Sequence, residues 1–163
     1  MNEPPDQRRG ATRRSTAADA QDPWQLRRFL SAQNETYARA LAELKSGQKR
    51  SHWMWFIFPQ IHGLGSSETA RCYAIKSREE ARQYLAHPVL GTRLVECARV
   101  LLGLVGRSAS EIFGYPDDLK LRSCMTLFAS VAAPGSVFAQ VLDKYYQGQG
   151  DARTLELLED LDR

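Results

Sequence analysis

Apolar residues recur at spacings of three and four along much of the chain, the spacing that places side chains on one face of an α-helix. The first such run extends from Trp24 to about Ser46, follows Asp22-Pro23 and precedes Gly47. Aspartate is a favoured N-cap, proline is tolerated in the first helical turn, and glycine often follows the last turn. This pattern predicts a single helix from Trp24 to Ser46.

Capping signals mark the starts of later helices. Residues 77–80 and 108–111 each contain a serine followed three residues later by a glutamate. This is the capping-box pattern, in which the two residues satisfy each other's backbone amides. Other starts are marked by a capping residue or a first-turn proline: His87-Pro88, Pro116, Ser136 and Asp151. Together with the first helix, these signals predict about seven helices.

Strand signals are missing from the sequence. No stretch of four or more residues alternates cleanly between apolar and polar side chains, and no Asn-Gly or Asp-Gly hairpin pair occurs. At 163 residues, with 43% hydrophobic and 25% charged residues, the chain has the size and composition of one globular domain. We predict a compact all-α domain over residues 22–163. Residues 1–21 are polar and lack apolar periodicity, which predicts a flexible arm.

Charge, hydropathy and cysteine content narrow the function classes. A formal net charge of +3 is too small to hold a protein on nucleic acid by itself at physiological salt. The longest apolar runs fall far short of the roughly 18 residues of a membrane span, and no secretory signal is recognisable, so we expect a cytoplasmic protein. Cys72, Cys97 and Cys124 are widely spaced and lack metal-ligand spacing. We therefore expect buried, reduced cysteines, no metal site and no bound cofactor.

The segment of residues 45–65 fits none of the regular patterns and reads KSGQKRSHWMWFIFPQIHGLG. Its basic residues stand directly ahead of His52, Trp53 and Trp55. Aromatic side chains usually form a core, but a helix over residues 53–58 would turn more than once, so some of them must face elsewhere. The tryptophans therefore either fill the core or form a pocket wall that stacks on a planar ligand.

Histidine chemistry is open to the same two interpretations. His52 stands between Arg50 and Trp53, where an imidazole can act as a general acid or base, or can be a satisfied structural group. His62, on a turn, and His87, beside a proline, are weaker candidates. His52 and His62 alone do not supply enough ligands to predict a metal site, and the sequence spacing adds no further ligand.

The helix that follows Pro116 carries a second polar cluster. Asp118 and Arg122 are spaced as an i,i+4 pair, and a solvated ion pair is the ordinary interpretation of such charges. Lys120 and Ser123 lie one turn apart on one face. If this face meets residues 50–60, the two segments form a positively lined cleft. No Gly-rich phosphate loop, nucleophile elbow or paired-cysteine motif accompanies it.

Three blocks of the sequence resemble a known bacterial family. They read KRSHWMWFIFPQIHGLG, YAIKSREEARQYLAHPVLGTRL and SASEIFGYPDDLKLRSCMTLFA, and the similarity extends over about residues 22–158. The family is domain of unknown function 1810. The resemblance implies a compact, multihelical, all-α cytosolic protein without an established activity. The name calpastatin, which some members carry, does not fit, because inhibitors of that kind are disordered and this pattern predicts a folded domain.

Three interpretations of the chain follow. The first is a protein that binds a small anionic ligand, a nucleotide or phosphorylated metabolite, in a cleft lined by residues 52–60, with or without catalysis. The alternative is an RNA- or protein-binding module that uses the basic and aromatic surface of residues 45–60. In the third, all of these residues serve the core and the helix caps. For the first hypothesis the candidate catalytic residue is His52, and the candidate ligand-binding residues are Arg50, Trp53, Trp55, Gln60, Lys120, Arg122 and Ser123.

Overall fold

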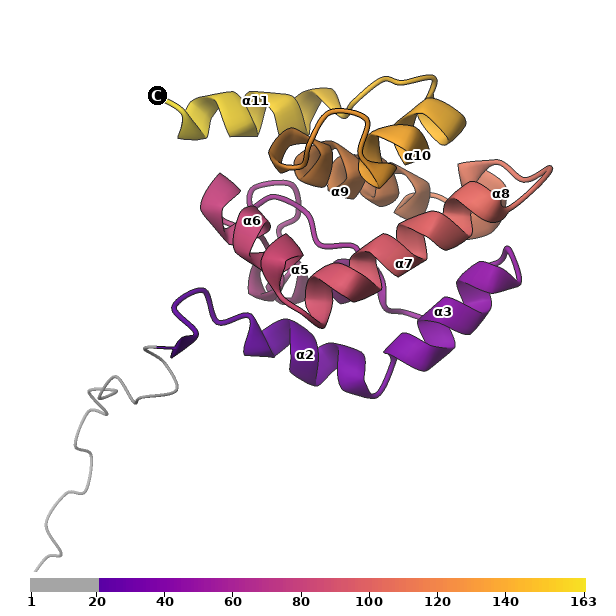
Figure 1. Ribbon diagram of the computed structural model, residues 1–163, viewed down its shortest axis with the longest axis horizontal. Helices are drawn as coiled ribbons and strands as arrows, with labels where there is room; N and C mark the ends of the chain where they lie inside the picture. Colours follow the sequence, from indigo (N-terminus) through magenta and orange to yellow (C-terminus); the bar gives the residue numbers. More distant parts are fainter. Residues whose placement is uncertain (1–20) are drawn as a thin grey trace, which may run out of the picture.

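A computed structural model of the chain describes residues 21–163 (Figure 1). Within this range it contains ten helices: α2 (Arg27–Asn34), α3 (Tyr37–Lys45), α4 (Met54–Ile57), α5 (Glu68–Cys72), α6 (Arg78–Ala86), α7 (Leu90–Gly103), α8 (Ala109–Phe113), α9 (Asp117–Val131), α10 (Val137–Tyr146) and α11 (Ala152–Leu161). The predicted flexible arm, residues 1–21, lies outside the described residues except for Gln21.

Helix α7 runs through the middle of the molecule, with α2 and α3 along one side and α9, α10 and α11 along the other (Figure 1). It packs against α3, α6 and α10, and α9 packs against α6, α8, α10 and α11. The faces that meet are apolar: Leu94, Cys97 and Leu101 of α7 and Leu121 and Phe128 of α9 are each at most 1% exposed. The two longest helices thus supply much of a single core.

The predicted fold class is confirmed. No strand occurs in residues 21–163, and the only extended pairing there is an isolated bridge between Ile61 and Ile75. The backbone amides of Ile75 and His62 donate to the carbonyls of Gln60 and Ile75, both at 2.8 Å. This bridge fixes the loop that follows α4 against the loop that precedes α6.

The prediction of one helix from Trp24 to Ser46 is wrong, because the chain breaks between α2 and α3. At the break, the Thr36 hydroxyl donates to the carbonyl of Ala32 at 2.5 Å, and the Thr36 amide bonds to Gln33 instead. Such back-bonding competes with the regular i→i−4 bond. The side chain of Gln33 donates to the Phe56 carbonyl at 2.7 Å and the Tyr84 hydroxyl at 2.9 Å. The apolar stripe of the sequence thus spans two helices, α2 and α3, which differ in direction (Figure 1).

The number of helices also exceeds the predicted seven, because one predicted helix is two and because the sequence patterns predict neither α4 nor α5. These two helices have four and five residues, too few to show an apolar period. The Ser67 side chain caps α5 by accepting from the Ala70 amide at 3.1 Å. Short helices held by tertiary contacts are invisible to a periodicity argument.

Most predicted caps are confirmed. Ser108 and Glu111 form a complete capping box, and Ser136 and Asp151 cap α10 and α11. Ser77 caps α6 by accepting from the Glu80 amide at 3.0 Å, but the Glu80 carboxylate does not complete a box. That carboxylate is only 3% exposed and pairs with Arg28 at 3.0 Å. A tertiary ion pair has replaced the local bond that the sequence pattern predicts.

Two further predictions concern the cysteines and membranes. Cys97 and Cys124 are buried as expected, whereas Cys72 is exposed at the end of α5. Among residues 21–163, no helix combines the length and the apolar character that a membrane span requires.

Candidate functional site

A cleft of about 300 Å³ lies where three distant parts of the chain meet. Its walls are the segment before α4 and α4 itself, the start of α5, and the first turn of α9. Its lining includes Lys49, His52, Trp55, Ser67, Thr69, Asp117 and Lys120. We call this hollow the lysine cleft. It brings the two candidate regions of the sequence, residues 50–60 and the helix after Pro116, to one place.

Asp117 lies between the two lysines. Its carboxylate accepts from Lys49 Nζ at 2.8 Å through one oxygen and from Lys120 Nζ at 3.2 Å through the other. Burial raises the pKa of Asp117, but the hydrogen bonds and charges of Lys49 and Lys120 outweigh it and leave the pKa lowered. The carboxylate is therefore ionised at neutral pH, and it balances one of the two lysine charges.

Both lysines also lie over indole rings. Lys49 Nζ is 4.9 Å from the Trp53 ring centroid, and Lys120 Nζ is 4.5 Å from that of Trp55. Trp53 is 1% exposed and packs with Phe58 and Phe113 in the core, so it serves mainly as the floor of the cleft. Trp55 is half-buried. One face of each ring is thus covered by an ammonium group of the protein itself.

Glu43, at the end of α3, holds the segment that leads into the cleft. Its carboxylate accepts from the amides of Arg50 and Ser51, from the Ser51 hydroxyl at 2.6 Å and from Trp53 Nε1 at 3.1 Å. Burial raises the pKa of Glu43, but these hydrogen bonds outweigh it and lower the pKa to about 2. Sequence reasoning missed this residue, because no motif links Glu43 with a loop seven to ten residues later.

Glycine makes a close approach at Gly65 possible. A Cβ atom there would lie 2.5 Å from the Ala70 Cβ and 2.8 Å from Trp55 Cη2. No side chain fits in that space without moving its neighbours. Gly65 and Ala70 therefore set the position of the Trp55 ring edge, and with it the wall of the cleft.

His52 lines the lysine cleft and is exposed at its rim. Among the described residues, no group donates to or accepts from its ring, so no partner fixes its orientation. Two other histidines lie elsewhere. His62 is exposed outside the cleft, and His87 Nδ1 accepts from the amides of Val89 and Leu90 at 3.1 and 3.2 Å, which caps α7.

Four of the candidate ligand-binding residues do not line the cleft. Arg50 is exposed, and its amide is bound by Glu43. Gln60 is 4% exposed, and its side-chain nitrogen lacks a partner among the described residues. Arg122 Nε donates to the Gln149 carbonyl at 2.9 Å, and the Ser123 hydroxyl donates to the Leu119 carbonyl at 3.1 Å. Trp53, Trp55, Lys120 and His52 are the candidates that the structure brings together.

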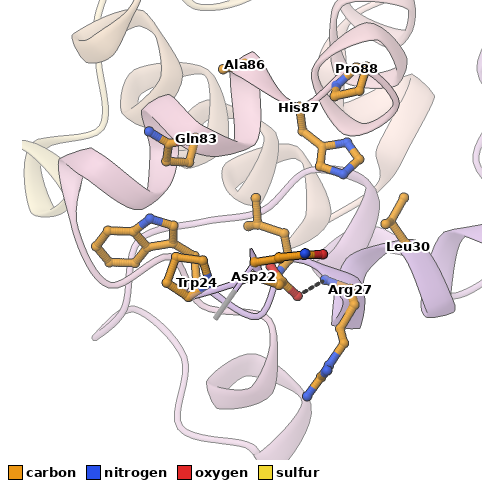
Figure 2. Close-up of a pocket in the computed structure, with 11 residues that line it drawn as sticks. Asp22, Trp24, Arg27, Leu30, Gln83, Ala86, His87 and Pro88 are labelled. Atoms are coloured by element: carbon orange, nitrogen blue, oxygen red, sulfur yellow. Dashed lines mark hydrogen bonds between the residues drawn. The ribbon is translucent and has the colours of Figure 1, made fainter. Parts of the chain in front are cut away.

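A second, larger hollow of about 720 Å³ lies between the start of the described chain and the junction of α6 and α7. We call it the amino-terminal groove. Figure 2 shows Trp24 at one end and Leu30 at the other, with the ring of His87 pointing into the space between them. The Asp22 carboxylate accepts from the amides of Leu26 and Arg27 at 2.8 and 3.1 Å. The His87 ring caps α7, and Gln83 donates to Glu79 at 2.8 Å.

The described residues contain no set of side chains arranged to bind a metal ion. Among residues 21–163, no three or more His, Cys, Asp or Glu side chains gather as they would around a metal ion. In the lysine cleft the carboxylate of Asp117 is already bound by two ammonium groups.

Comparison with known proteins identifies the family without assigning an activity. The chain is 52% identical to the conserved hypothetical protein Rv1873 from Mycobacterium tuberculosis, whose crystal structure superposes with a TM-score of 0.83. The similarity covers 85% of this chain and 99% of that one. Among curated proteins, no sequence matches this chain. The model of a family described as "Protein of unknown function (DUF1810)" matches residues 23–158, and the chain therefore belongs to this family.

Proposed function

We propose that the protein binds a small anionic ligand, a nucleotide or phosphorylated metabolite, in the lysine cleft. The single observation that carries this proposal is the convergence of Lys120 of α9 with His52 and Trp55 of the segment around α4 on one hollow. Its volume of about 300 Å³ is at the lower end of the range for small-molecule sites. A mononucleotide or a smaller metabolite suits this size.

The charges around the cleft favour an anion. Lys49 and Lys120 contribute two positive charges, and Asp117 contributes the negative charge between them. The cleft therefore has a surplus of one positive charge before His52 is considered. A partly enclosed site strengthens the attraction of a fixed charge for an anion, because water screens it less.

In this proposal His52 acts mainly by binding the ligand, and catalysis is not required of it. A general acid or base is usually oriented by a second side chain, and among the described residues nothing orients the His52 ring. An exposed imidazole at the rim can still donate to a ligand. Catalysis by His52 would require the ligand to complete the arrangement.

The RNA- or protein-binding alternative draws less support from the geometry. Lys49 has a side chain only 7% exposed, and Trp53 is 1% exposed, so neither offers a surface to a large partner. Lys45 and Arg50 remain exposed. Binding through such a surface would weaken steeply with salt, which separates it experimentally from binding in a cleft.

The test is a binding screen with matched histidine variants. Nucleotides, sugar phosphates and small carboxylates are titrated into the wild type while tryptophan fluorescence is recorded, and bound ligands are then tested on His52→Ala and His62→Ala. We expect at least one phosphorylated compound to bind, with an affinity lowered about fivefold or more by His52→Ala and unchanged by His62→Ala. Equal affinity in both variants, or no binding by any compound, would overturn the proposal.

A further inference from the structure

We propose that the lysine cleft recognises a phosphoryl group, from a phosphate monoester or free phosphate, and that Lys120 is the cation that contacts it while Lys49 is not. This inference rests on the proposed function and specifies its ligand class. It follows from a comparison of the hydrogen-bonding groups around the cleft, some of which have partners within the protein while others have none among the described residues.

The groups that line the cleft are mainly donors. Lys120 has three N–H donors, and the hydroxyls of Ser67 and Thr69 can each donate one hydrogen. The Ser67 oxygen accepts from Ala70, which leaves its own hydrogen available. Among residues 21–163, no group bonds to the Thr69 hydroxyl or to the His52 ring. These groups face water in the free protein, and a ligand rich in acceptors can replace that water.

Strong acceptors are scarce in the cleft. Asp117 is the only carboxylate that lines it within the described chain, and both of its oxygens are already bound by ammonium groups. A ligand that presents hydrogen-bond donors or a positive charge would find no vacant carboxylate. A phosphoryl group presents three terminal oxygens and no obligatory donor, whereas a carboxylate presents two. The surplus of donors fits the phosphoryl group better.

The two lysines differ in how many hydrogen bonds they make within the protein. Lys49 Nζ donates to the Ser51 carbonyl at 2.6 Å and to Asp117 at 2.8 Å, and it lies over Trp53. Lys120 Nζ bonds among the described residues only to Asp117, at 3.2 Å, and its side chain is 24% exposed against 7% for Lys49. Lys120 thus has donors to spare and faces the ligand.

This difference also gives Asp117 a role. Lys49 keeps the carboxylate ionised and in place when Lys120 turns toward a phosphoryl oxygen. Partly exposed pairs such as Asp117 and Lys120 contribute little to stability, so an anionic ligand can compete for the lysine. Because Lys120 lies over the Trp55 ring, its movement changes the surroundings of that indole.

The experiment measures anion binding by the amide chemical shifts of residues 67–69 and 120. Inorganic phosphate, methyl phosphate and acetate are each titrated to about 20 mM, where millimolar dissociation constants are measurable, at constant ionic strength set with chloride. The proteins are the wild type, Lys120→Met and Lys76→Met; Lys76 is an exposed lysine outside the cleft and serves as the control.

We expect phosphate or methyl phosphate to bind the wild type and Lys76→Met alike, and Lys120→Met about tenfold more weakly. The stronger binder of the two shows whether the source is free phosphate or a monoester. Binding of acetate but of neither phosphate compound would overturn the phosphoryl assignment and leave an anion cleft. Equal binding by Lys120→Met and Lys76→Met would overturn the role of Lys120. If no anion shifts these amides, the proposed function fails as well.

Discussion

The amino-terminal groove is larger than the lysine cleft, but the cleft offers a ligand more polar and charged groups to bind. The groove is more than twice as large, at about 720 Å³ against about 300 Å³. Three of its polar side chains are nevertheless bonded within the protein: Asp22 and His87 bind backbone amides at helix starts, and Gln83 binds Glu79. In the cleft, Lys120, Thr69 and His52 retain donors that no described residue uses.

From this contrast we expect hydrogen-bonding capacity that the protein itself does not use to be a better guide to a binding site than volume. A large hollow whose acidic, amide and imidazole groups already bond within the protein offers a ligand mainly apolar contact. A smaller one that combines positive charge with water-facing donors can exchange those water contacts for charge-assisted hydrogen bonds to an anion. Variants around the groove should therefore change stability, and variants inside the cleft should change binding.

The largest expected effect lies at Arg28, which does not line the groove but bonds to the backbone of Trp24, a residue that does. Its guanidinium donates to the carbonyls of Trp24, Cys72 and Ala74 and pairs with the buried Glu80. Arg28→Met would leave that carboxylate buried and unpaired, which should lower the free energy of unfolding by about 3 to 5 kcal/mol in urea titrations. The double variant Arg28→Met/Glu80→Leu should recover part of the loss. A single-variant loss under about 1 kcal/mol would show that the network is not structural.

Steric crowding at the wall of the cleft gives the next effect. Gly65→Ala forces a methyl group against Ala70 and the Trp55 ring, and overpacking of this kind costs about 1 to 3 kcal/mol. It should also move Trp55 and shift its fluorescence. The matched control is Gly103→Ala, where a Cβ meets nothing within 4 Å. Similar melting temperatures for the two variants would contradict the close approach.

A pH-dependent effect follows from Glu43. Its pKa is about 2 in the folded protein against an ordinary value of 4.5, so its ionised form stabilises the fold above about pH 4.5. This contribution is lost as the pH falls from about 4.5 to about 2. At pH 7, Glu43→Gln should cost about 1.5 kcal/mol, because the amide replaces a charged acceptor.

The same urea titrations, repeated at falling pH, check the Glu43 prediction. The difference between wild type and Glu43→Gln should shrink steadily through the acid range, because the wild-type carboxylate becomes a neutral acid. A constant difference from pH 7 to pH 2 would mean that Glu43 acts through packing alone.

The smallest effect is expected from removal of residues 1–20. This segment has no apolar periodicity in the sequence, so its loss should change the free energy of unfolding by less than about 0.5 kcal/mol. Phosphate binding at the cleft should be unaffected. A melting temperature lowered by many degrees would show that these residues contribute to the region around the groove, which begins at Gln21.

Local signals account for the part of the fold that the sequence could predict. Ser108, Ser136 and Asp151 cap helices through bonds to amides three residues away, so a short window contains both partners. Apolar spacing likewise identifies α7 and α11. Where both partners of an interaction lie within one turn, the sequence is enough.

Interactions over longer distances account for the errors. Glu80 has the position of a capping-box glutamate, but its partner Arg28 lies 52 residues earlier. The break at Thr36, in a segment whose apolar stripe continues, lies beside Gln33, whose side chain donates to the Phe56 carbonyl and the Tyr84 hydroxyl 23 and 51 residues later. No pattern within a short window reveals such competition.

The candidate site shows the same division. Residue type singled out His52, Trp55 and Lys120, since histidine, indole and ammonium groups carry recognisable chemistry. Arg50 and Arg122 have equally suitable side chains, yet neither lines the cleft. Which cations converge depends on how α9 meets the segment before α4, and this arrangement is set by packing and not by residue type.

The hydrogen bonds that the Glu43 carboxylate accepts from residues 50–53 have a consequence for hydrogen exchange. Arg50 is exposed and outside any helix, a setting in which an amide normally exchanges with solvent at once. Its amide is nevertheless held at 2.6 Å by the Glu43 carboxylate, and that of Ser51 at 2.9 Å. In deuterated water these two amides, together with the indole N–H of Trp53, should exchange on the slow timescale of a helix, so that an irregular loop leading into the cleft behaves as part of the rigid body.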